Sequence, residues 1–314
     1  MKHLITLKDW SKEQIEEVMD LSLKIKKLPE NFYDTMYRRV LVMIFEKPSL
    51  RTRISFETGM SQMGGNAIFY DMANSPLGAG KETMHDTVKT ISRYADLLMA
   101  RVFEHEKIEE MERYADIPVI NGLTDFNHPC QILSDLLTVS EKKAALKGLT
   151  LAYLGDAKNN VTHSLLYGCS KTGININVGC PKGEDFNPMQ KVLDDCNAIC
   201  DKSGATIKVG HDPFDAVQGA DVIYTDSWMS YHVPSEELES RVKTLKPFQV
   251  DWEKIQLAAP DVIFMNCLPA MRGYEQTAEV IDGPHSVVFD QAENRLHCQK
   301  AIMVKLLEES TANK

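Results

Sequence analysis

The sequence lacks a long apolar segment, an excess of basic residues and the apolar core of a secretory leader. No window approaches the ~20 consecutive apolar residues that a membrane-spanning helix needs, so we expect no membrane span. The formal net charge is −10, whereas a nucleic-acid surface needs clustered lysine and arginine. Acidic residues interrupt the N-terminal segment, which is therefore read as mature structure. These absences favour a cytoplasmic protein without nucleic-acid partners, in which any anionic ligand must be bound by a local cluster of charge.

The cysteines show no pairing pattern. Seven are scattered through the chain, which is typical of free thiols in a reducing compartment. Cys196 and Cys200 stand four residues apart on an expected helix, but no Cys or His pair lies at ligand spacing nearby. We therefore expect neither a metal site nor a disulfide framework.

The length predicts two domains. A chain of 314 residues exceeds the usual size of a single core, and 43% hydrophobic with 25% charged residues is ordinary globular composition. Lys142, Lys143 and Gly148 mark the expected boundary. We predict a first domain over residues 1–140 and a second over 141–314, with a last helix at about 292–309 that returns to the first domain.

Apolar runs alternate with amphipathic stretches throughout. A helix is expected after Ser11, and the later alternation is typical of βαβ units. The sequence thus predicts an α/β protein of two doubly wound parallel-sheet domains, with the active site in the cleft between them. The expected strands are 39–45, 67–70, 97–102, 118–121, 150–154, 175–178, 206–210, 222–225 and 262–266, with Val287–Phe289 as a further one; the expected helices are 52–63, 82–94, 106–114, 130–139, 161–172, 188–203 and 292–309.

Hydroxyls and guanidinium groups follow the first of these strands. Ser49, Arg51, Thr52 and Arg53 stand where a helix should begin. The N–H groups of a helix N-terminus, together with Ser, Thr and Arg donors, can hold a phosphate or carboxylate. The alternative is an ordinary capped helix with solvated arginines.

Other polar residues stand at expected strand ends, where open α/β sheets bind ligands. His128 and Gln131 could grip a carbonyl and its amide, although a lone histidine is often structural. In the second half, the loops after residues 154, 225 and 266 should converge on one edge. The first is not a GxGxxG fingerprint, which argues against a dinucleotide-binding dehydrogenase. Cys267, taken alone, would more often be a buried packing residue.

Taken together, these motifs resemble the aspartate/ornithine carbamoyltransferase family. The resemblance rests on Ser-x-Arg-Thr-Arg at 49–53, His-Pro-x-Gln at 128–131, Leu-Gly-Asp at 154–156 and Cys-Leu-Pro-Ala at 267–270, in this order over nearly the whole chain. The segment Glu293–His297 with Ala301 is similar to the ornithine branch. The resemblance implies an enzyme that transfers a carbamoyl group from carbamoyl phosphate to the δ-amine of ornithine, without a cofactor, typically as a homotrimer.

The family also implies roles for single residues. Arg101, His128 and Arg295 would act at the carbamoyl oxygen, with Cys267 beside the attacking amine. The residues implied for carbamoyl phosphate are Ser49, Leu50, Arg51, Thr52, Arg101, His128, Gln131, Cys267 and Arg295, and those implied for ornithine are Asn160, Asp226, Ser230, Tyr231, Cys267 and Leu268.

Four positions depart from the family pattern. Leu50 stands where a hydroxyl residue is usual, so one phosphate donor is missing while backbone N–H donors remain. Ser230 is followed by Tyr231 and His232 in the loop that chooses the amine. Asn266 replaces a histidine and removes a titratable group. The loop 75–81, which in the family reaches a neighbouring subunit, lacks the usual glutamine, for which Lys81 would substitute in part.

These departures leave two alternatives open. Tyr231 and His232 allow putrescine or another amine as acceptor, although Asp226 and Ser230 suit the charged end of an amino acid. A non-catalytic paralogue that binds a ligand or partner is the other reading. Retention of the Arg, His and Gln set argues against it. The sequence leaves open whether the reaction runs toward citrulline or toward carbamoyl phosphate.

Overall fold

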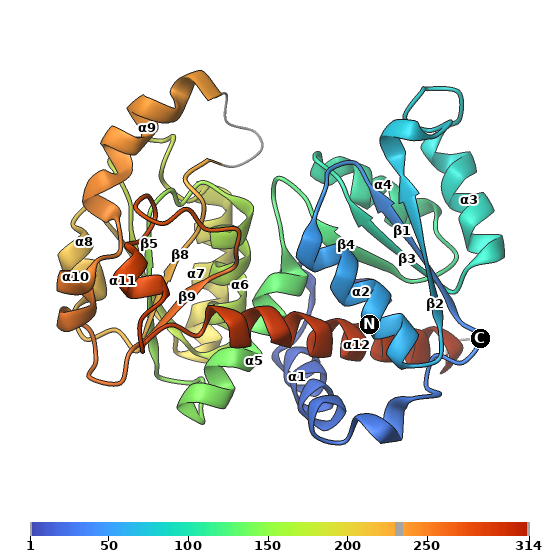
Figure 1. Cartoon of the computed structure of the whole chain (residues 1–314), viewed down its shortest axis with the longest axis horizontal. Helices are drawn as coiled ribbons and strands as arrows, with labels where there is room; N and C mark the ends of the chain where they lie inside the picture. The colour runs from blue at the N-terminus through green and yellow to red at the C-terminus, as the bar shows by residue number, and fades with distance from the viewer. Residues whose placement is uncertain (1, 230–234, 313–314) are drawn as a thin grey trace. The chain divides into compact units, whose positions relative to one another are not determined.

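The computed structural model describes residues 2–229 and 235–312, which form two compact units (Figure 1). The first unit contains residues 1–137 and 293–314, and the second contains residues 138–292. Each unit is an α/β structure around one parallel sheet. Among the described residues, none of the helices is long and apolar enough to cross a membrane.

The first unit has a four-stranded parallel sheet of order β2-β1-β3-β4. The order reverses between β1 and β3, so the carboxyl ends of these two strands flank the switch point at which such sheets bind ligands. The strands are β1 (Val40–Phe45), β2 (Asn66–Asp71), β3 (Leu97–Arg101) and β4 (Val119–Leu123).

The helices of the first unit begin where local signals place them. Ser11 caps α1 through a capping box with Gln14, as its position before an amphipathic stretch suggests. The last helix belongs to this unit from Glu293 onward, and its Asn294 accepts a hydrogen bond from Lys26 at 2.9 Å. The helices are α1 (Lys12–Lys27), α2 (Leu50–Gln62), α3 (Met84–Tyr94), α4 (His105–Tyr114), α5 (Pro129–Lys143) and α12 (Val288–Ala312), of which α5 and α12 run across the unit boundary.

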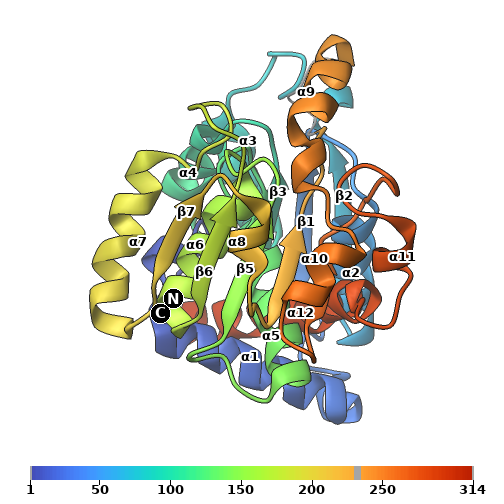
Figure 2. The ribbon, with the colours of Figure 1, turned by 90° about the vertical axis from the view of Figure 1, so that its left-hand side faces the viewer.

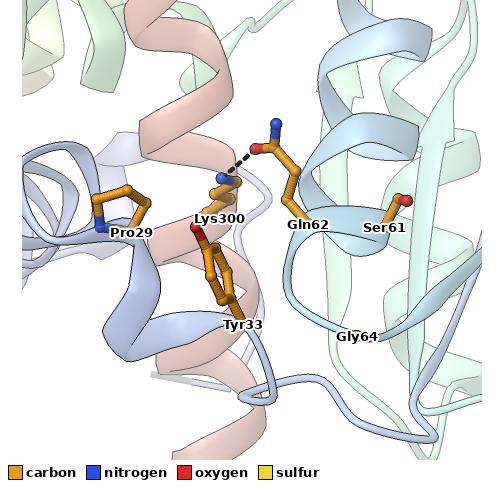
Figure 3. Close-up of a pocket in the computed structure, with 6 residues that line it drawn as sticks. All are labelled: Pro29, Tyr33, Ser61, Gln62, Gly64 and Lys300. Atoms are coloured by element: carbon orange, nitrogen blue, oxygen red, sulfur yellow. Dashed lines mark hydrogen bonds between the residues drawn. The ribbon is translucent and has the colours of Figure 1, made fainter.

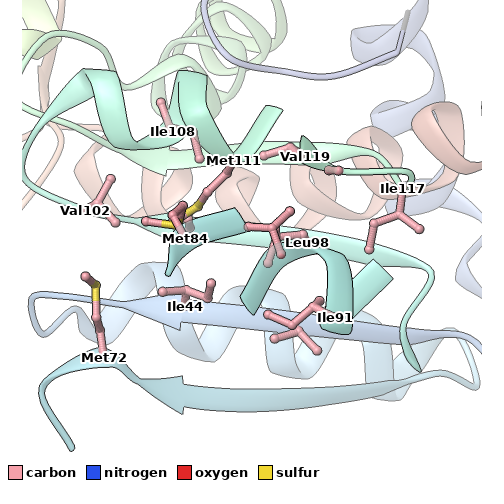
Figure 4. Packing of buried hydrophobic residues seen from close by; sticks show 14 of the residues in the cluster. Ile44, Met72, Met84, Ile91, Leu98, Val102, Ile108, Met111, Ile117 and Val119 are labelled. Carbon is pink, nitrogen blue, oxygen red and sulfur yellow. The ribbon is translucent and has the colours of Figure 1, made fainter. Parts of the chain in front are cut away.

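A hydrophobic core lies between the sheet and the pair α3 and α4 (Figure 4). Strand residues such as Ile44 and Leu98 pack there against Val88 and Ile91 of α3 and Met111 of α4. These side chains are almost entirely removed from water, and such burial contributes ~25 cal/mol per Å² of apolar surface. The core therefore holds the strands whose carboxyl ends carry the polar residues.

The second unit has a five-stranded parallel sheet of order β7-β6-β5-β8-β9. Figure 2 shows β7, β6 and β5 side by side. Here the order reverses between β5 and β8, which again defines a switch point. The strands are β5 (Thr150–Leu154), β6 (Asn175–Gly179), β7 (Ile207–Gly210), β8 (Val222–Thr225) and β9 (Ile263–Asn266).

The helices of the second unit include several short ones that the periodicity did not predict. Gly173 and Gly204 end α6 and α7 in the left-handed conformation, which glycine adopts without steric cost. The helices are α6 (Asn160–Thr172), α7 (Gln190–Ser203), α8 (Pro213–Val217), α9 (Leu238–Leu245), α10 (Trp252–Leu257) and α11 (Ala278–Ile281).

One predicted strand is wrong. Val287–Phe289 is not an additional strand, because α12 begins at Val288. Val287 and Val288 are buried whereas Phe289 is 72% exposed, so the apolar run is the start of a half-buried helix. A run of three apolar residues does not distinguish a strand from a helix end.

Candidate functional site

The carboxyl end of β1 leads into the predicted anion-binding segment. Ser49 is the N-cap of α2, and its hydroxyl accepts a hydrogen bond from the Thr52 N–H at 3.3 Å. Arg51 lies in the first turn of α2, where backbone N–H groups and the helix dipole favour a bound anion. Leu50 is 68% exposed. Because a leucine side chain has no polar group, only the backbone of Leu50 can bind an anion.

Arg295 joins three of the predicted residues directly. Its guanidinium donates to Gln131 Oε1 at 2.6 Å and to Thr52 Oγ1 at 3.3 Å, and these residues come from α12, α5 and α2. All three side chains are at most 2% exposed. Gln131 in turn donates to Asp135 at 2.8 Å, which fixes the orientation of its amide. Gln131 and Arg295, which are 164 residues apart in the sequence, therefore meet inside the first unit.

His128 lies within the field of four cations. The side chain is buried, and burial lowers the pKa of His128 well below its usual value, with further lowering by Arg295, Arg101, Lys47 and Arg51. The imidazole is therefore neutral at pH 7. A neutral imidazole can still donate one N–H, which is the role that an oxyanion donor requires.

Lys47 is a member of this group that sequence reasoning missed. Its side chain is 4% exposed, and its Nζ lies 4.4 Å from the centroid of the Phe103 ring. Burial, followed by the charge of Arg101, lowers the pKa of Lys47 to about 8. Its place between β1 and Ser49 was a possible signal, but burial cannot be read from the residue type. We call Lys47, Arg51, Arg101 and Arg295 the cationic cluster.

In the second unit, two predicted residues meet at the ends of β8 and β9. The Cys267 thiol donates to Asp226 Oδ1 at 3.1 Å. Asp226 is 9% exposed and follows β8 directly, and Cys267 follows β9. Asn160 opens α6 at the end of the loop from β5, and its neighbour Asn159 is the N-cap, donating to the Tyr153 hydroxyl at 2.9 Å. Asn160, Asp226 and Cys267 thus lie in or at the end of the loops that follow three neighbouring strands.

Asn266 has a structural task at the position where the family has histidine. It is fully buried, accepts from the Leu268 N–H at 2.7 Å and donates to Gln276 Oε1 at 3.0 Å. Leu268 has φ of +57°, a left-handed conformation that is unfavourable for a branched side chain. The Asn266 amide therefore holds Leu268 in a conformation that the chain alone would not prefer.

Three predicted site residues are not placed with these groups. Ser230 and Tyr231 lie outside the described residues. Lys81 is exposed at the end of the loop 75–81, where its N–H donates to the Pro76 carbonyl at 2.9 Å. Their roles stay predictions.

A separate hollow of about 510 Å³ lies in the first unit and contains none of the predicted residues (Figure 3). Pro29, Tyr33, Ser61, Gln62, Gly64 and Lys300 line it. The Lys300 ammonium donates to the Gln62 amide oxygen, so this pair connects α12 with the end of α2. The two helices that carry Arg295 and Arg51 are thus fastened together.

The two parallel sheets with their flanking helices define an α/β fold, and the cationic cluster makes the first unit suited to an anionic ligand. Residues 2–141 match the carbamoyl-P binding domain, and residues 147–306 the Asp/Orn binding domain, of aspartate/ornithine carbamoyltransferases. The chain therefore belongs to the aspartate/ornithine carbamoyltransferase family.

Individual relatives agree with this assignment over nearly their whole length. The ornithine carbamoyltransferase of Anoxybacillus flavithermus is 48% identical, over 98% of this chain and 96% of the relative. The ornithine carbamoyltransferase of Bacillus subtilis is 46% identical, over 100% of this chain and 96% of the relative. Among solved structures, ornithine carbamoyltransferase from Pyrococcus furiosus has a TM-score of 0.93 at 43% identity, with coverage of 98% and 97%. The predicted family and fold are confirmed.

Proposed function

We propose that this chain transfers the carbamoyl group between carbamoyl phosphate and the δ-amine of L-ornithine, giving L-citrulline and phosphate. The observation that carries the proposal is the cationic cluster at the switch point of the first sheet. In a chain of net charge −10, four cations around one buried imidazole form a local site for a doubly charged acyl phosphate. The names of the relatives supply the acceptor, ornithine.

The reaction needs positioning and charge stabilisation. The neutral amine attacks the carbamoyl carbon, a C–N bond forms, the C–O bond to phosphate breaks, and the proton lost by the amine ends on the released phosphate. We assign Ser49, Leu50 (through its backbone), Arg51 and Thr52 to the phosphate, and Arg101, His128 and Arg295 to the carbamoyl oxygen. Gln131 would bind the carbamoyl amide. Preorganised donors at a developing oxyanion are commonly worth about 3–4 kcal/mol each.

We assign the amine substrate to the second unit. Asp226 and Asn160 would bind the α-amino and α-carboxylate end together with Ser230 and Tyr231, and Cys267 and Leu268 would lie beside the δ-amine. The Cys267–Asp226 hydrogen bond supports a shared role for these two residues.

The test is a turnover assay with carbamoyl phosphate and, separately, ornithine, putrescine, aspartate or N-acetylornithine, in which ureido product and phosphate are measured together. We expect saturable product only with ornithine, at one phosphate per citrulline. Turnover with putrescine alone would move the assignment to a putrescine enzyme. If none of the four amines gave product, the chain would be a ligand-binding paralogue rather than an enzyme.

We further propose a homotrimer that works in the cytoplasm. Leu50 and Ile54 on α2 and Ile68 and Phe69 on β2 are between 37% and 68% exposed, and such neighbouring apolar side chains suit a subunit interface. Lys81 would reach the site of an adjacent subunit. The seven free thiols suit a reducing compartment. Light scattering should give three times the 35.4 kDa chain mass, and a monomer would contradict the trimer.

A further inference from the structure

The loop that begins at Asp226 is held by two charged residues that the proposed mechanism does not use. The Trp228 N–H donates to Glu275 Oε1 at 3.2 Å, and the Trp228 carbonyl accepts from Arg241 Nε at 3.0 Å. A carboxylate therefore binds the N–H of Trp228, and a guanidinium binds its carbonyl. Trp228 itself is 1% exposed, so both contacts are made to a residue that is buried from solvent.

Each of the two charged residues is also tied to a second loop. The other carboxylate oxygen of Glu275 accepts from the Met271 N–H at 3.0 Å, in the segment that follows Cys267 and Leu268. Arg241 pairs with Asp156, the residue after the Leu-Gly turn of β5, and its guanidinium lies 5.4 Å from the Phe186 ring centroid. The loops after β5, β8 and β9 are thus fastened to one another through Trp228.

Burial makes these contacts costly to remove. Glu275 is 1% exposed and Asp156 is 8% exposed. Burial raises the pKa of both carboxyl groups above their usual values. A buried carboxylate is tolerated where backbone N–H groups or a cation bind it, as here. The loss of one such partner leaves a buried polar group without its hydrogen bond. A loop that needed only to connect two elements would not require this arrangement.

We propose that Glu275 and Arg241 are positioning residues that clamp the segment 226–229 and thereby set the affinity and selectivity for the amine substrate. The clamped segment carries Asp226 at one end and leads into Ser230 and Tyr231 at the other. Holding Trp228 fixes the Asp226 carboxylate where the Cys267 thiol meets it. The inference rests on the proposed function for its substrate, but the clamp itself is a property of the loops.

Glu275→Gln tests the carboxylate, because an amide can accept from only one of the two N–H groups. We expect the KM for ornithine to rise about tenfold or more, the KM for carbamoyl phosphate to stay within twofold, and the preference for ornithine over putrescine to fall. Glu279→Gln, which removes the same charge from an exposed site on α11, is the matched control and should change none of these values.

Arg241→Gln tests the guanidinium, with the exposed Lys243→Gln on the same helix as control. We expect the same changes in KM and preference as for Glu275→Gln. Arg241→Lys should keep the wild-type values only in part, since one ammonium group cannot reproduce the planar guanidinium fork. An equal rise in both KM values, or an unchanged ornithine KM in both variants, would overturn the proposal.

Hydrogen exchange separates the clamp from the proposed function. The amides of residues 226–229 should exchange about tenfold faster in Glu275→Gln than in the wild-type chain or in Glu279→Gln. Unchanged exchange would overturn the clamp even if activity fell. If the wild-type chain made no citrulline, the proposed function would fail, while this exchange measurement would still decide whether Glu275 holds the loop.

Discussion

The two units present their polar residues in different ways. In the first, the charges of the cationic cluster act on the buried His128, and the Arg295 side chain of α12 joins Gln131 of α5 to Thr52 of α2. In the second, Asp226, Cys267 and Leu268 lie on loops, and Asn266, Glu275 and Arg241 bind backbone groups of these loops. The first arrangement concentrates charge for an anion, whereas the second fixes loop shape. We therefore expect changes in the first unit to alter phosphate binding and chemistry, and changes in the second to alter the choice and affinity of the amine.

The strongest prediction concerns Arg101, which ends β3 and is 7% exposed. Arg101→Gln should lower kcat by about 10²–10³-fold, because a donor aimed at developing charge is lost in a buried site. Steady-state citrulline formation measures this. Arg113→Gln, a change of the same kind at the end of α4, should have no effect. A loss of less than about fivefold for Arg101→Gln would remove this residue from the chemistry.

Asn266 should affect the stability of the fold. Asn266→Ala leaves the half-buried Leu268 N–H and the buried Gln276 amide oxygen without their partner. We expect the free energy of unfolding to fall by about 2 kcal/mol, within the range for an unsatisfied buried group. Urea denaturation measures this change, with the exposed Asn197→Ala as control. An unaltered midpoint would show that Leu268 keeps its conformation without Asn266.

Lys47 should make phosphate binding depend on pH. In the free protein its pKa is lowered to about 8, so the side chain is charged below this pH and neutral above it. An anion binds the charged form, and the affinity for carbamoyl phosphate should therefore fall by up to about tenfold per pH unit above pH 8. Equilibrium binding between pH 7 and 9.5 measures this without the titration of the amine substrate. In Lys47→Met the affinity should be lower at pH 7 and nearly flat to pH 9.5, and a profile like that of the wild type would assign the titration to another group.

The smallest expected effect is at Leu50. Leu50→Thr restores a hydroxyl at an exposed position beside Arg51, and we expect the KM for carbamoyl phosphate to fall about threefold, the effect of a modest hydrogen bond. Leu50→Ala is the control, since it removes the leucine without adding a donor. Equal KM values for the two variants would show that backbone donation alone serves this position.

Much of this arrangement was predictable from the sequence because it depends on local patterns. The buried strands β5 and β8 have the predicted bounds, and Ser49 lies before a helix as its neighbours indicate. The family was recognisable from motifs that stand at strand ends. Val287–Phe289 failed because three apolar residues fit a strand or the first turn of a helix equally well.

The rest depends on tertiary contacts that no local pattern encodes. Lys47 follows a buried strand, and only the structure shows that its side chain is buried beside Phe103. Glu275 holds Trp228 from 47 residues away, and nothing at either position indicates the other. Asn266 was noticed only as a missing histidine, although its partner Gln276 explains why an amide can serve there. Charged residues that act on backbone groups are the least visible in a sequence.

The division of labour between the two units is tested most directly by two-substrate kinetics on the wild-type chain, Arg101→Gln and Glu275→Gln, with carbamoyl phosphate and ornithine each varied against the other. We predict that Arg101→Gln lowers kcat and weakens the binding of carbamoyl phosphate while leaving the ornithine KM nearly unchanged. Glu275→Gln should raise the ornithine KM alone. If the two variants changed kcat, the carbamoyl phosphate KM and the ornithine KM in the same way, the account would be contradicted.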